Sequence, residues 1–530
     1  NFRKMSLFNW TSFFGSVQQS NSSRIQVNSP DIKNDGNVLV SNFEYRRNEI
    51  KSTSEGIIVT PKRHQYRFQT TLKPKKTGLL LVGLGGNNGS TVVGATIANR
   101  EKMSWQTRNG IQKANYFGSI TQSTTVHIGW DGTKQIHIPF NGILPMVHPN
   151  DLIIDGWDIN NANLYEAMLR SKVFEPDLIS QLKPHMETIV PKPSIYYPDF
   201  IASNQQDRAN NIIPGNSKSE HLEKIRQDIR DFKQKHELET VIVLWTANTE
   251  RYTEVKNGLN TTSDEILNSI SQNKSEISPS NIFAVASILE GAHYINGSPQ
   301  NTLVPGIIEL AQKNSVFLGG DDFKSGQTKL KSALVDFLVN SGLKPESIVS
   351  YNHLGNNDGK NLSEARQFKS KEISKSSVVD DMVAANTILF EDGKKPDHCI
   401  VIKYVPFVGD SKRAMDEYIC SIFMGGHQTL AIHNTCEDSL LAAPLILDLA
   451  IITELCSRIL YSNETTNDLT SFHSVLSVLS LLLKAPVVPK GTPVGNAFMK
   501  QFGALTKLLT ACAGIASDSD LQLEFFTKLE

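Results

Sequence analysis

The chain has 530 residues, of which 39% are hydrophobic and 20% charged, and its formal net charge at pH 7 is −1. This length predicts several domains with a substantial core, and the composition is that of an ordinary globular protein. The near-neutral balance excludes the global positive charge that favours binding to nucleic acid or to an anionic membrane.

The cysteines and the longest apolar run further limit the class of protein to which this chain can belong. The five cysteines are scattered and form no C-x-x-C pair, which argues against a disulfide framework and a structural zinc site. They favour a reducing compartment. The apolar run 440–455 contains Pro444, Asp448 and Glu454, so we expect a buried helix and not a membrane span.

A pattern of strand followed by helix begins at Gly78. The apolar runs do not alternate with polar residues, as is typical of a parallel sheet that is covered on both faces. We therefore expect a doubly wound α/β domain. A hairpin-rich excursion over 112–140 separates its first helix from its second strand. The expected strands lie in 78–85, 151–160, 240–250, 292–300 and 315–323, and the first helices in 90–102 and 162–174.

The pattern changes after residue 328. A helix over 328–342 precedes strand-like runs that are separated by short turns, which predicts a second, mostly antiparallel α+β domain. The last 90 or so residues are predicted to be apolar helices. The predicted segments are 1–74, 75–328, 329–440 and 441–530.

The stretch LLLVGLGGNNGST, residues 79–91, combines a strand, a glycine loop and a helix start. Gly83, Gly85 and Gly89 are spaced G-x-G-x-x-x-G, one residue longer than the standard dinucleotide fingerprint. Such a loop lets the backbone approach a pyrophosphate at the positive end of a helix. The acid expected to hold the adenosine ribose is Asp158. A glycine turn without function and a loop for S-adenosylmethionine are the alternatives.

Polar residues cluster at two further places. Asp321 and Asp322 follow a predicted strand, and Ser325, Gly326 and Gln327 open the next helix, where N–H groups can bind an anion. The loop Asn356-Asn357-Asp358 suits phosphate or sugar hydroxyls, although a plain surface turn explains it nearly as well.

Four lysines could act on an anionic intermediate. Lys371 and Lys375 are four residues apart on one helix face, where each charge is expected to depress the pKa of the other lysine. Lys412 ends the stretch GDSK with Asp410 and Ser411, and Lys484 follows an apolar run. Singly, each lysine is better explained as a surface residue. Together with a dinucleotide loop, they suggest a site for a phosphorylated substrate whose reaction develops an oxyanion.

At this point several long blocks resemble the eukaryotic myo-inositol-1-phosphate synthase family. They include GLGGNNGST, GWDINNANLYEAM, VLWTANTERY, GDDFKSGQTK, SYNHLGNNDGKNLS, SKEISKSSVVDD and GDSKRAMDEY. The resemblance runs from about residue 40 nearly to the C-terminus, and the longer glycine spacing is the family's own. It implies a Rossmann-like NAD-binding domain followed by a catalytic and tetramerisation domain, with the N- and C-terminal segments packed together.

The resemblance also implies a redox-neutral isomerisation of D-glucose 6-phosphate to 1L-myo-inositol 1-phosphate by a cytoplasmic homotetramer that retains NAD. It leaves open whether a monovalent cation such as ammonium assists. Lys371 with Asp322 is the implied proton shuttle at the C5 oxygen, Lys412 and Lys484 the implied oxyanion stabilisers, and Lys375 a phosphate ligand. The implied substrate-binding residues are Ser325, Gly326, Gln327, Asn356, Asn357, Asp358, Lys375, Lys412 and Lys484. The implied NAD-binding residues are Gly83, Gly85, Gly86, Asn87, Asn88, Gly89, Asp158, Asn160, Ser194, Thr246, Ala247, Thr249, Ser298, Asp322, Asp410, Ser411 and Asp438.

Two other functions remain as alternatives. An ordinary NAD-dependent sugar-phosphate dehydrogenase would release NADH and needs no lysine cluster. A nucleotide-binding sensor or scaffold would be expected to lack the four lysines, all of which are present.

Overall fold

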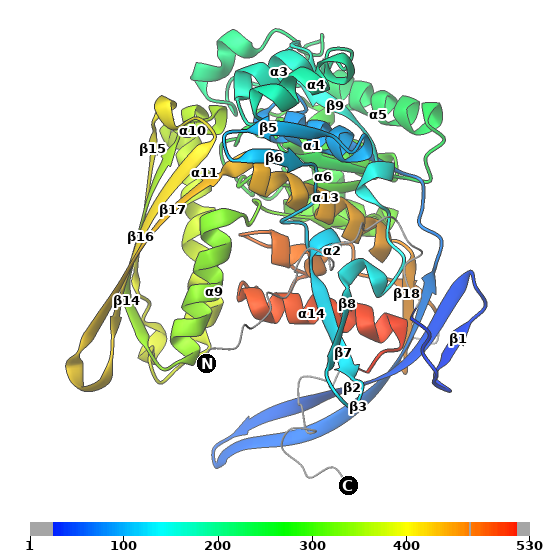
Figure 1. Ribbon diagram of the computed structural model, residues 1–530, viewed down its shortest axis with the longest axis vertical. Coiled ribbons are helices and arrows are strands. Elements are labelled where there is room, and N and C mark those ends of the chain that lie inside the picture. Colours follow the sequence, from blue (N-terminus) through cyan, green and yellow to red (C-terminus); the bar gives the residue numbers. More distant parts are fainter. Residues whose placement is uncertain (1–24, 466–467, 517–530) are drawn as a thin grey trace, which may run out of the picture.

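The computed structural model describes residues 25–465 and 468–516 (Figure 1). Three sheets and the helices around them make up most of this part of the chain. The ends of the chain, 1–24 and 517–530, lie outside the described residues. The predicted α/β class is confirmed, whereas the four segment boundaries stay predictions.

The central sheet is parallel and has the strand order β10-β9-β4-β11-β12-β13. Numbered along the chain, this is the 3-2-1-4-5-6 order of a doubly wound dinucleotide-binding fold. The strand order reverses between β4 and β11, and ligands bind at such a switch point. The strands are β4 (Thr77–Val82), β9 (Ile153–Asp158), β10 (Lys192–Pro193), β11 (Thr240–Trp245), β12 (His293–Asn296) and β13 (Leu318–Gly319).

Both faces of this sheet are covered, because β4 is fully buried and its successive side chains point to opposite faces. Leu79 and Leu81 belong to one core cluster, and Leu80 and Val82 to another. The first cluster includes side chains of α1 (Asn87–Arg100), α3 (Leu164–Ser171), α4 (Pro176–Met186) and α13 (Asp438–Cys456). The second includes side chains of α5 (Lys218–Lys235), α6 (Ser263–Ser271), α7 (Pro279–Leu289) and α8 (Pro305–Asn314).

Helix α13 is long and apolar enough to cross a membrane by length and composition, with a mean hydropathy of 1.9. Its side chains are packed against α1 and the sheet, and 89% of its apolar window is buried. The prediction of a buried helix over 440–455 is therefore confirmed.

The excursion predicted between the first helix and the second strand is present. It consists of two antiparallel hairpins joined by a short helix. This insertion explains why Asp158 lies so far along the chain from the glycine loop. Its elements are β5 (Ser104–Thr107), β6 (Gly110–Lys113), α2 (Ile120–Ser123), β7 (Thr125–Trp130) and β8 (Gln135–Pro139).

The second sheet lies beside the first domain, on the left in Figure 1. Its order is β15-β14-β16-β17, and only the β14–β15 pair is parallel, so the mostly antiparallel prediction is confirmed. The strands are β14 (Lys344–Leu354), β15 (Asp397–Tyr404), β16 (Ser411–Ser421) and β17 (His427–Glu437). The associated helices are α9 (Gly326–Asn340), α10 (Asn357–Asn361), α11 (Ala365–Ser376) and α12 (Asp380–Ala384).

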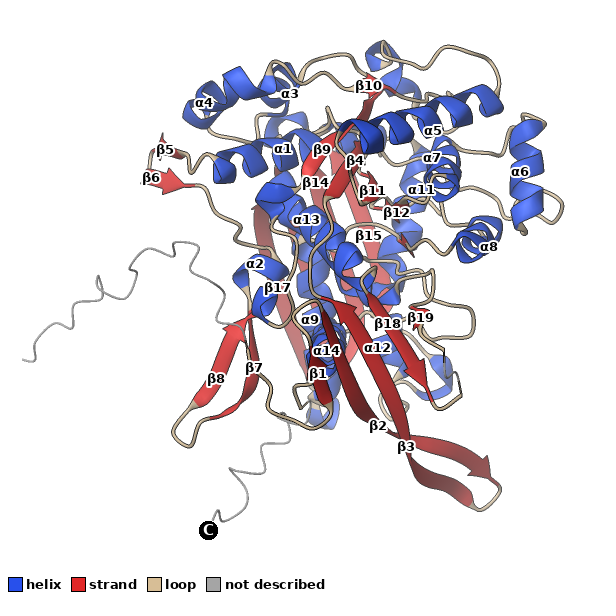
Figure 2. Cartoon of the chain, turned by 90° about the vertical axis from the view of Figure 1, so that its right-hand side faces the viewer, coloured by secondary structure: helices blue, strands red, loops and turns tan. Residues whose placement is uncertain are grey.

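The third sheet joins early and late segments of the chain. Strand β3 (Gly56–Thr71) forms a long hairpin with β2 (Val38–Thr53) and also pairs antiparallel with β18 (Ile459–Asn463). The hairpin projects from the body of the molecule (Figure 2). The prediction that the last 90 residues are helices was partly wrong, because β18 and β19 (Thr470–Ser471) belong to this sheet. The remaining strand is β1 (Ile32–Asn34), and the last helix is α14 (Phe498–Ala513).

Candidate active site

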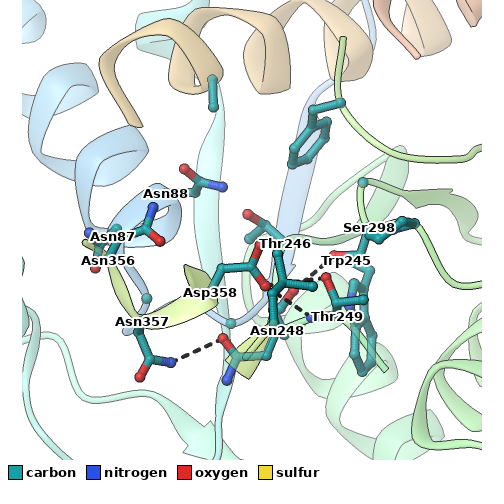
Figure 3. A pocket seen from close by; sticks show the side chains of 18 of the residues that line it. Asn87, Asn88, Trp245, Thr246, Asn248, Thr249, Ser298, Asn356, Asn357 and Asp358 are labelled. Carbon is teal, nitrogen blue, oxygen red and sulfur yellow. Dashed lines mark hydrogen bonds between the residues drawn. The ribbon is translucent and has the colours of Figure 1, made fainter. Parts of the chain in front are cut away.

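One deep cavity lies at the switch point of the parallel sheet and reaches toward the second sheet (Figure 3). Its wall is formed by the ends of β4, β9, β11, β12 and β14 and by the starts of several helices. The predicted site residues that line it are Gly83, Gly86, Asn87, Asn88, Asp158, Ser194, Thr246, Ala247, Thr249, Ser298, Asp322, Ser325, Asn356, Asn357, Asp358, Lys371, Lys375, Lys412, Asp438 and Lys484.

The glycine loop has a backbone that other residues could not adopt without a shift. Gly83 has φ +95°, and a Cβ there would lie 2.7 Å from the Cα of Ala247 on the neighbouring strand end. A Cβ on Gly89 would lie 2.4 Å from the carbonyl oxygen of Leu84. Helix α1 begins at Asn87, three residues earlier than expected, and its N-cap residue is Gly86, which has no side chain to cap it. Its N-terminal N–H groups can therefore bind a pyrophosphate.

Asp158 lies at the end of β9 beside this loop. Its carboxylate accepts a hydrogen bond from the backbone N–H of Asn160 at 2.9 Å, and a Cβ on Gly85 would lie 3.2 Å from Oδ2. Burial raises the pKa of Asp158, and the charge of Arg208, followed by that of Arg170, opposes this effect. A carboxylate at this position suits the ribose hydroxyls of NAD.

The opposite wall presents hydroxyl groups from the ends of β11 and β12. Ser298 donates its hydroxyl to the carbonyl of Ala247 at 2.8 Å. The Thr246 hydroxyl lines the cavity, is buried and has no hydrogen-bond partner within the described residues. Buried polar groups normally have partners, so this hydroxyl indicates a position for a ligand. Together with the cramped glycine loop and Asp158, these groups fit a dinucleotide such as NAD.

A buried cluster of charge lies at the other end of the cavity. The carboxylate of Asp322 contacts the Nζ of Lys371 at 3.0 Å and the Nζ of Lys484 at 3.3 Å. The Ser374 hydroxyl donates to the second oxygen of the same carboxylate. Asp322 follows β13, Lys371 and Ser374 lie on α11, and Lys484 follows the 3-10 helix η9 (Ser477–Leu482). Three distant segments of the chain therefore build one ionic group.

The pKa values in this cluster diverge. Burial alone would raise the pKa of Asp322, but the charges of Lys371 and Lys484 hold it well below its ordinary value. Burial lowers the pKa of Lys371, but the carboxylates of Asp322, Asp358 and Asp438 together outweigh burial, so the net shift is upward. The prediction that Lys371 has a depressed pKa was wrong, because Asp322 contacts it directly. Burial lowers the pKa of Lys484 to about 7.

Lys375 and Lys412 face the same cavity with different partners. The Nζ of Lys375 donates to the side chains of Asn352 and Gln327, at 3.1 and 3.3 Å. Burial and the charges of the other lysines, Lys412 first, hold its pKa well below the ordinary value, as predicted for this residue. Lys412 contacts Asp438 at 3.5 Å. An excess of cations at this end favours an anionic ligand such as a phosphate.

Several predicted residues support the cavity without lining it. Asp410 accepts hydrogen bonds from the Ser439 hydroxyl at 2.7 Å and from the Asn87 amide at 3.2 Å, and so connects α13 to the glycine loop. Gln327 bridges Lys375 and Asp416. The predicted residues outside the lining are Gly85, Gly89, Asn160, Gly326, Gln327, Asp410 and Ser411.

Several side chains of the wall were not predicted from the sequence, among them Trp245, Asn248 and Arg208. The Asn357 amide donates to Asn248 at 3.0 Å, and the carboxylate of Asp358 accepts from the Thr249 hydroxyl at 3.2 Å (Figure 3). Asn248 lies between two predicted residues of the VLWTANTERY block, so its position was the available signal. In residues 25–465 and 468–516, no group of three His, Cys, Asp or Glu could hold a metal ion.

Comparison with known proteins agrees with this geometry. The family model described as myo-inositol-1-phosphate synthase matches residues 77–510. An inositol-3-phosphate synthase of Dictyostelium discoideum is 55% identical, with 94% of this chain and 98% of that protein covered. An inositol-3-phosphate synthase 1 of rice, Oryza sativa subsp. japonica, is 54% identical, with 94% and 99% covered.

Solved structures give the same result. The crystal structure of an inositol-3-phosphate synthase from Caenorhabditis elegans is 70% identical, with a TM-score of 0.94 and coverage of 96% of this chain and 99% of that chain. A synthase-related protein from Thermotoga maritima, at 18% identity and a TM-score of 0.59 over 82% and 98% of the two chains, shares the fold. The chain therefore belongs to the myo-inositol-1-phosphate synthase family.

Proposed function

We propose that this protein isomerises D-glucose 6-phosphate to 1L-myo-inositol 1-phosphate, which is 1D-myo-inositol 3-phosphate, in a redox-neutral reaction that depends on NAD. Membership of the family supports this activity. The observation that carries the proposal is that the cluster of Asp322, Lys371 and Lys484 opens into the same cavity as the glycine loop. Hydride chemistry and oxyanion stabilisation can therefore act on one substrate.

We assign the cofactor to the glycine loop, Asp158 and the hydroxyl-lined wall. The N-terminus of α1 would bind the pyrophosphate, Asp158 the adenosine ribose, and Thr246 and Ser298 the half that carries the reacting ring. When bound, NAD supplies the chemistry of taking a hydride from C5 of the substrate and returning it.

Loss of the hydride from C5 also requires a base at the C5 hydroxyl. We assign this role to Lys484, because its pKa of about 7 leaves a large neutral fraction at physiological pH. Lys371, which the sequence favoured, is held charged by Asp322 and is better suited to donating a hydrogen bond to the C5 oxygen. In this arrangement Asp322 orients both lysines.

The ring closes after the C5 ketone has formed, because the ketone acidifies the protons at C6. The resulting enolate attacks the C1 aldehyde, and negative charge moves from one oxygen to the other. Lys412 and Lys371 would stabilise these oxyanions by charge. We assign the substrate phosphate to Lys375 and to Ser325 at the start of α9, where the helix N-terminus adds a favourable dipole. The phosphate itself would take the C6 proton.

Three further parts of the proposal concern the surroundings of the enzyme. A cytoplasmic location is supported by five free cysteines. Assembly as a homotetramer is supported by large apolar side chains near the second sheet, such as Phe407 and Phe423, which are 92% and 88% exposed. The third part is that a monovalent cation such as ammonium assists the reaction. Activity assays with and without ammonium test this part of the proposal.

The test of the activity is product analysis. The purified chain is incubated with ¹³C-labelled glucose 6-phosphate and a catalytic amount of NAD, while NMR follows carbon and absorbance follows NADH. Formation of inositol 1-phosphate without accumulating NADH supports the proposal. Stoichiometric NADH with an open-chain ketone would identify a dehydrogenase, and absence of turnover despite NAD binding would favour the sensor.

A further inference from the structure

Two arginines, neither of them predicted from the sequence as a site residue, lie at the adenosine end of the cavity. Arg208 ends the 3-10 helix η4 (Ser203–Arg208) and lines the cavity together with Asp158. Arg170 lies on α3, where its guanidinium donates to the carbonyl of Gly85 at 2.5 Å and to the side chain of Asn160 at 3.3 Å. Both contacts belong to the segments that carry the glycine loop and Asp158.

Neither guanidinium forms an ion pair within the part of the chain that the structure describes. In residues 25–465 and 468–516, no carboxylate oxygen lies within 4.0 Å of Arg208 or Arg170. The nitrogen contact of Arg208 in this part of the chain is a weak one, to the side chain of Gln205 at 3.4 Å. Burial of Arg208 and the charge of Arg170 lower the pKa of Arg208, while Asp158 raises it. Two cations, the half-buried Arg208 and the exposed Arg170, therefore lie beside the one buried carboxylate of Asp158, and the sum of these three charges is positive.

This arrangement has consequences for the carboxylate. Burial raises the pKa of Asp158, and the charges of Arg208 and Arg170 act in the opposite direction, toward its ionised form. An ionised carboxylate accepts hydrogen bonds from the ribose 2′- and 3′-hydroxyls and repels a 2′-phosphate, which carries a charge of nearly −2. An arginine near the same position is the feature by which related folds accommodate a 2′-phosphate. In this protein the acid that repels a 2′-phosphate, Asp158, and two arginines that could bind one lie side by side.

We propose that Asp158 is the one group that excludes a 2′-phosphate, and that Arg208 and Arg170 are further specificity-determining residues that form a latent site for it. The arginines support Asp158 when NAD is bound, and they can hold a 2′-phosphate once the carboxylate charge is removed. The inference rests on the proposed function for its NAD site and adds how that site chooses between two cofactors.

The experiment measures dissociation constants of NAD and NADP by isothermal titration calorimetry on the full chain, without turnover. Asp158→Asn keeps the size of the side chain and an oxygen that can accept from the Asn160 N–H. We expect this variant to weaken NAD binding about tenfold, because the charged hydrogen bonds from the ribose hydroxyls to the carboxylate are lost. We expect it to tighten NADP binding at least about tenfold, because the 2′-phosphate gains charged hydrogen bonds from the arginines.

Double variants identify the group that holds the phosphate. Asp158→Asn with Arg208→Gln is expected to lose most of the gain in NADP affinity, and Asp158→Asn with Arg208→Lys to keep part of it, since lysine retains charge without the planar fork. The matched control is Asp158→Asn with Arg108→Gln, which removes an exposed arginine in the turn between β5 and β6 and should keep the full gain.

Two results would overturn the inference: no gain in NADP affinity for Asp158→Asn, or a gain that Arg208→Gln leaves intact. Failure of the proposed function has a different signature, because the wild-type chain would then form no inositol 1-phosphate from glucose 6-phosphate in the product analysis, whatever the NADP affinity of its variants. A wild type that binds NAD and turns over substrate, beside an Asp158→Asn variant without an NADP gain, refutes this inference alone.

Discussion

Replacing Asp322 with asparagine should disable and destabilise the protein, whereas the same change at Asp321 should do little. The two aspartates are adjacent and both are buried, with exposed fractions of 2% and 8%. The electrostatic surroundings of the two carboxyl groups differ. Lys371 and Lys484 hold the pKa of Asp322 well below its ordinary value, whereas burial raises the pKa of Asp321 well above its ordinary value and so favours its neutral form.

The magnitude follows from the geometry. At the 3.0 Å separation of Asp322 and Lys371, with an effective dielectric constant of about 20, the attraction is about 5 kcal/mol. Removing one partner of a buried pair costs about 3–5 kcal/mol, because a charge is left buried without compensation. We expect a loss of about 3 kcal/mol for Asp322→Asn, since Lys484 can lose its proton. For Asp321→Asn we expect less than about 1 kcal/mol, because burial already favours the neutral form of Asp321, and the amide oxygen of asparagine can still accept the hydrogen bond from Asn296.

The assay is urea unfolding of both variants at pH 7 and matched protein concentration, together with kcat/KM. The pKa of Asp322 is depressed by folding, so its contribution is present above its unfolded value of about 4 and lost as the pH falls below it. The measurement at pH 7 therefore detects the whole contribution. We expect kcat/KM to fall at least about a hundredfold for Asp322→Asn alone. Equal losses in the two variants would refute the assignment of charge.

Three other predictions test separate parts of the molecule. The kcat/KM of the wild type should fall below about pH 7 as Lys484 becomes protonated. Lys484→Arg should lower kcat about a hundredfold or more at every pH, because arginine stays charged. A variant whose kcat/KM falls at low pH in the same way as that of the wild type would contradict this role for Lys484. Gly89→Ala should weaken NAD binding at least about tenfold in calorimetry, because the new Cβ would lie 2.4 Å from a backbone oxygen. The control is Gly503→Ala, which has open space around it and should leave the dissociation constant of NAD unchanged. Arg458→Met should lower the free energy of unfolding by about 3–5 kcal/mol, because it leaves the fully buried carboxylate of Glu454 without its ion-pair partner. Denaturant titration measures this loss, and a loss below about 1 kcal/mol would contradict the prediction.

The parts of the fold and site that could be predicted depend on local patterns. The apolar run before Gly83 and the glycines after it define a strand, a tight turn and a helix within one short segment. The spacing of Lys371 and Lys375 places both on one helix face. These features were confirmed because neighbouring residues alone determine them. The alternation of strands and helices indicated the doubly wound class, and the order of the central strands was not predicted.

The parts that could not be predicted depend on contacts between distant segments. The raised pKa of Lys371 arises from Asp322, which is 49 residues away in the sequence and meets it only in the folded chain. Arg208 ends a short 3-10 helix that has no periodic pattern, so nothing local marks it as a wall of the cavity. Strand β18 pairs with β3 across most of the chain, which the apolar composition of the late segment did not indicate.

The most direct test of the redox-neutral mechanism follows a label at the carbon that loses and regains the hydride. Glucose 6-phosphate carrying deuterium at C5 is incubated with the enzyme and an excess of unlabelled NAD, and the product is analysed by mass spectrometry and NMR. The account predicts inositol 1-phosphate that retains deuterium at the carbon derived from C5, with none in the NAD pool. A product without deuterium at that carbon, or deuterium accumulating in the free cofactor, would contradict the account.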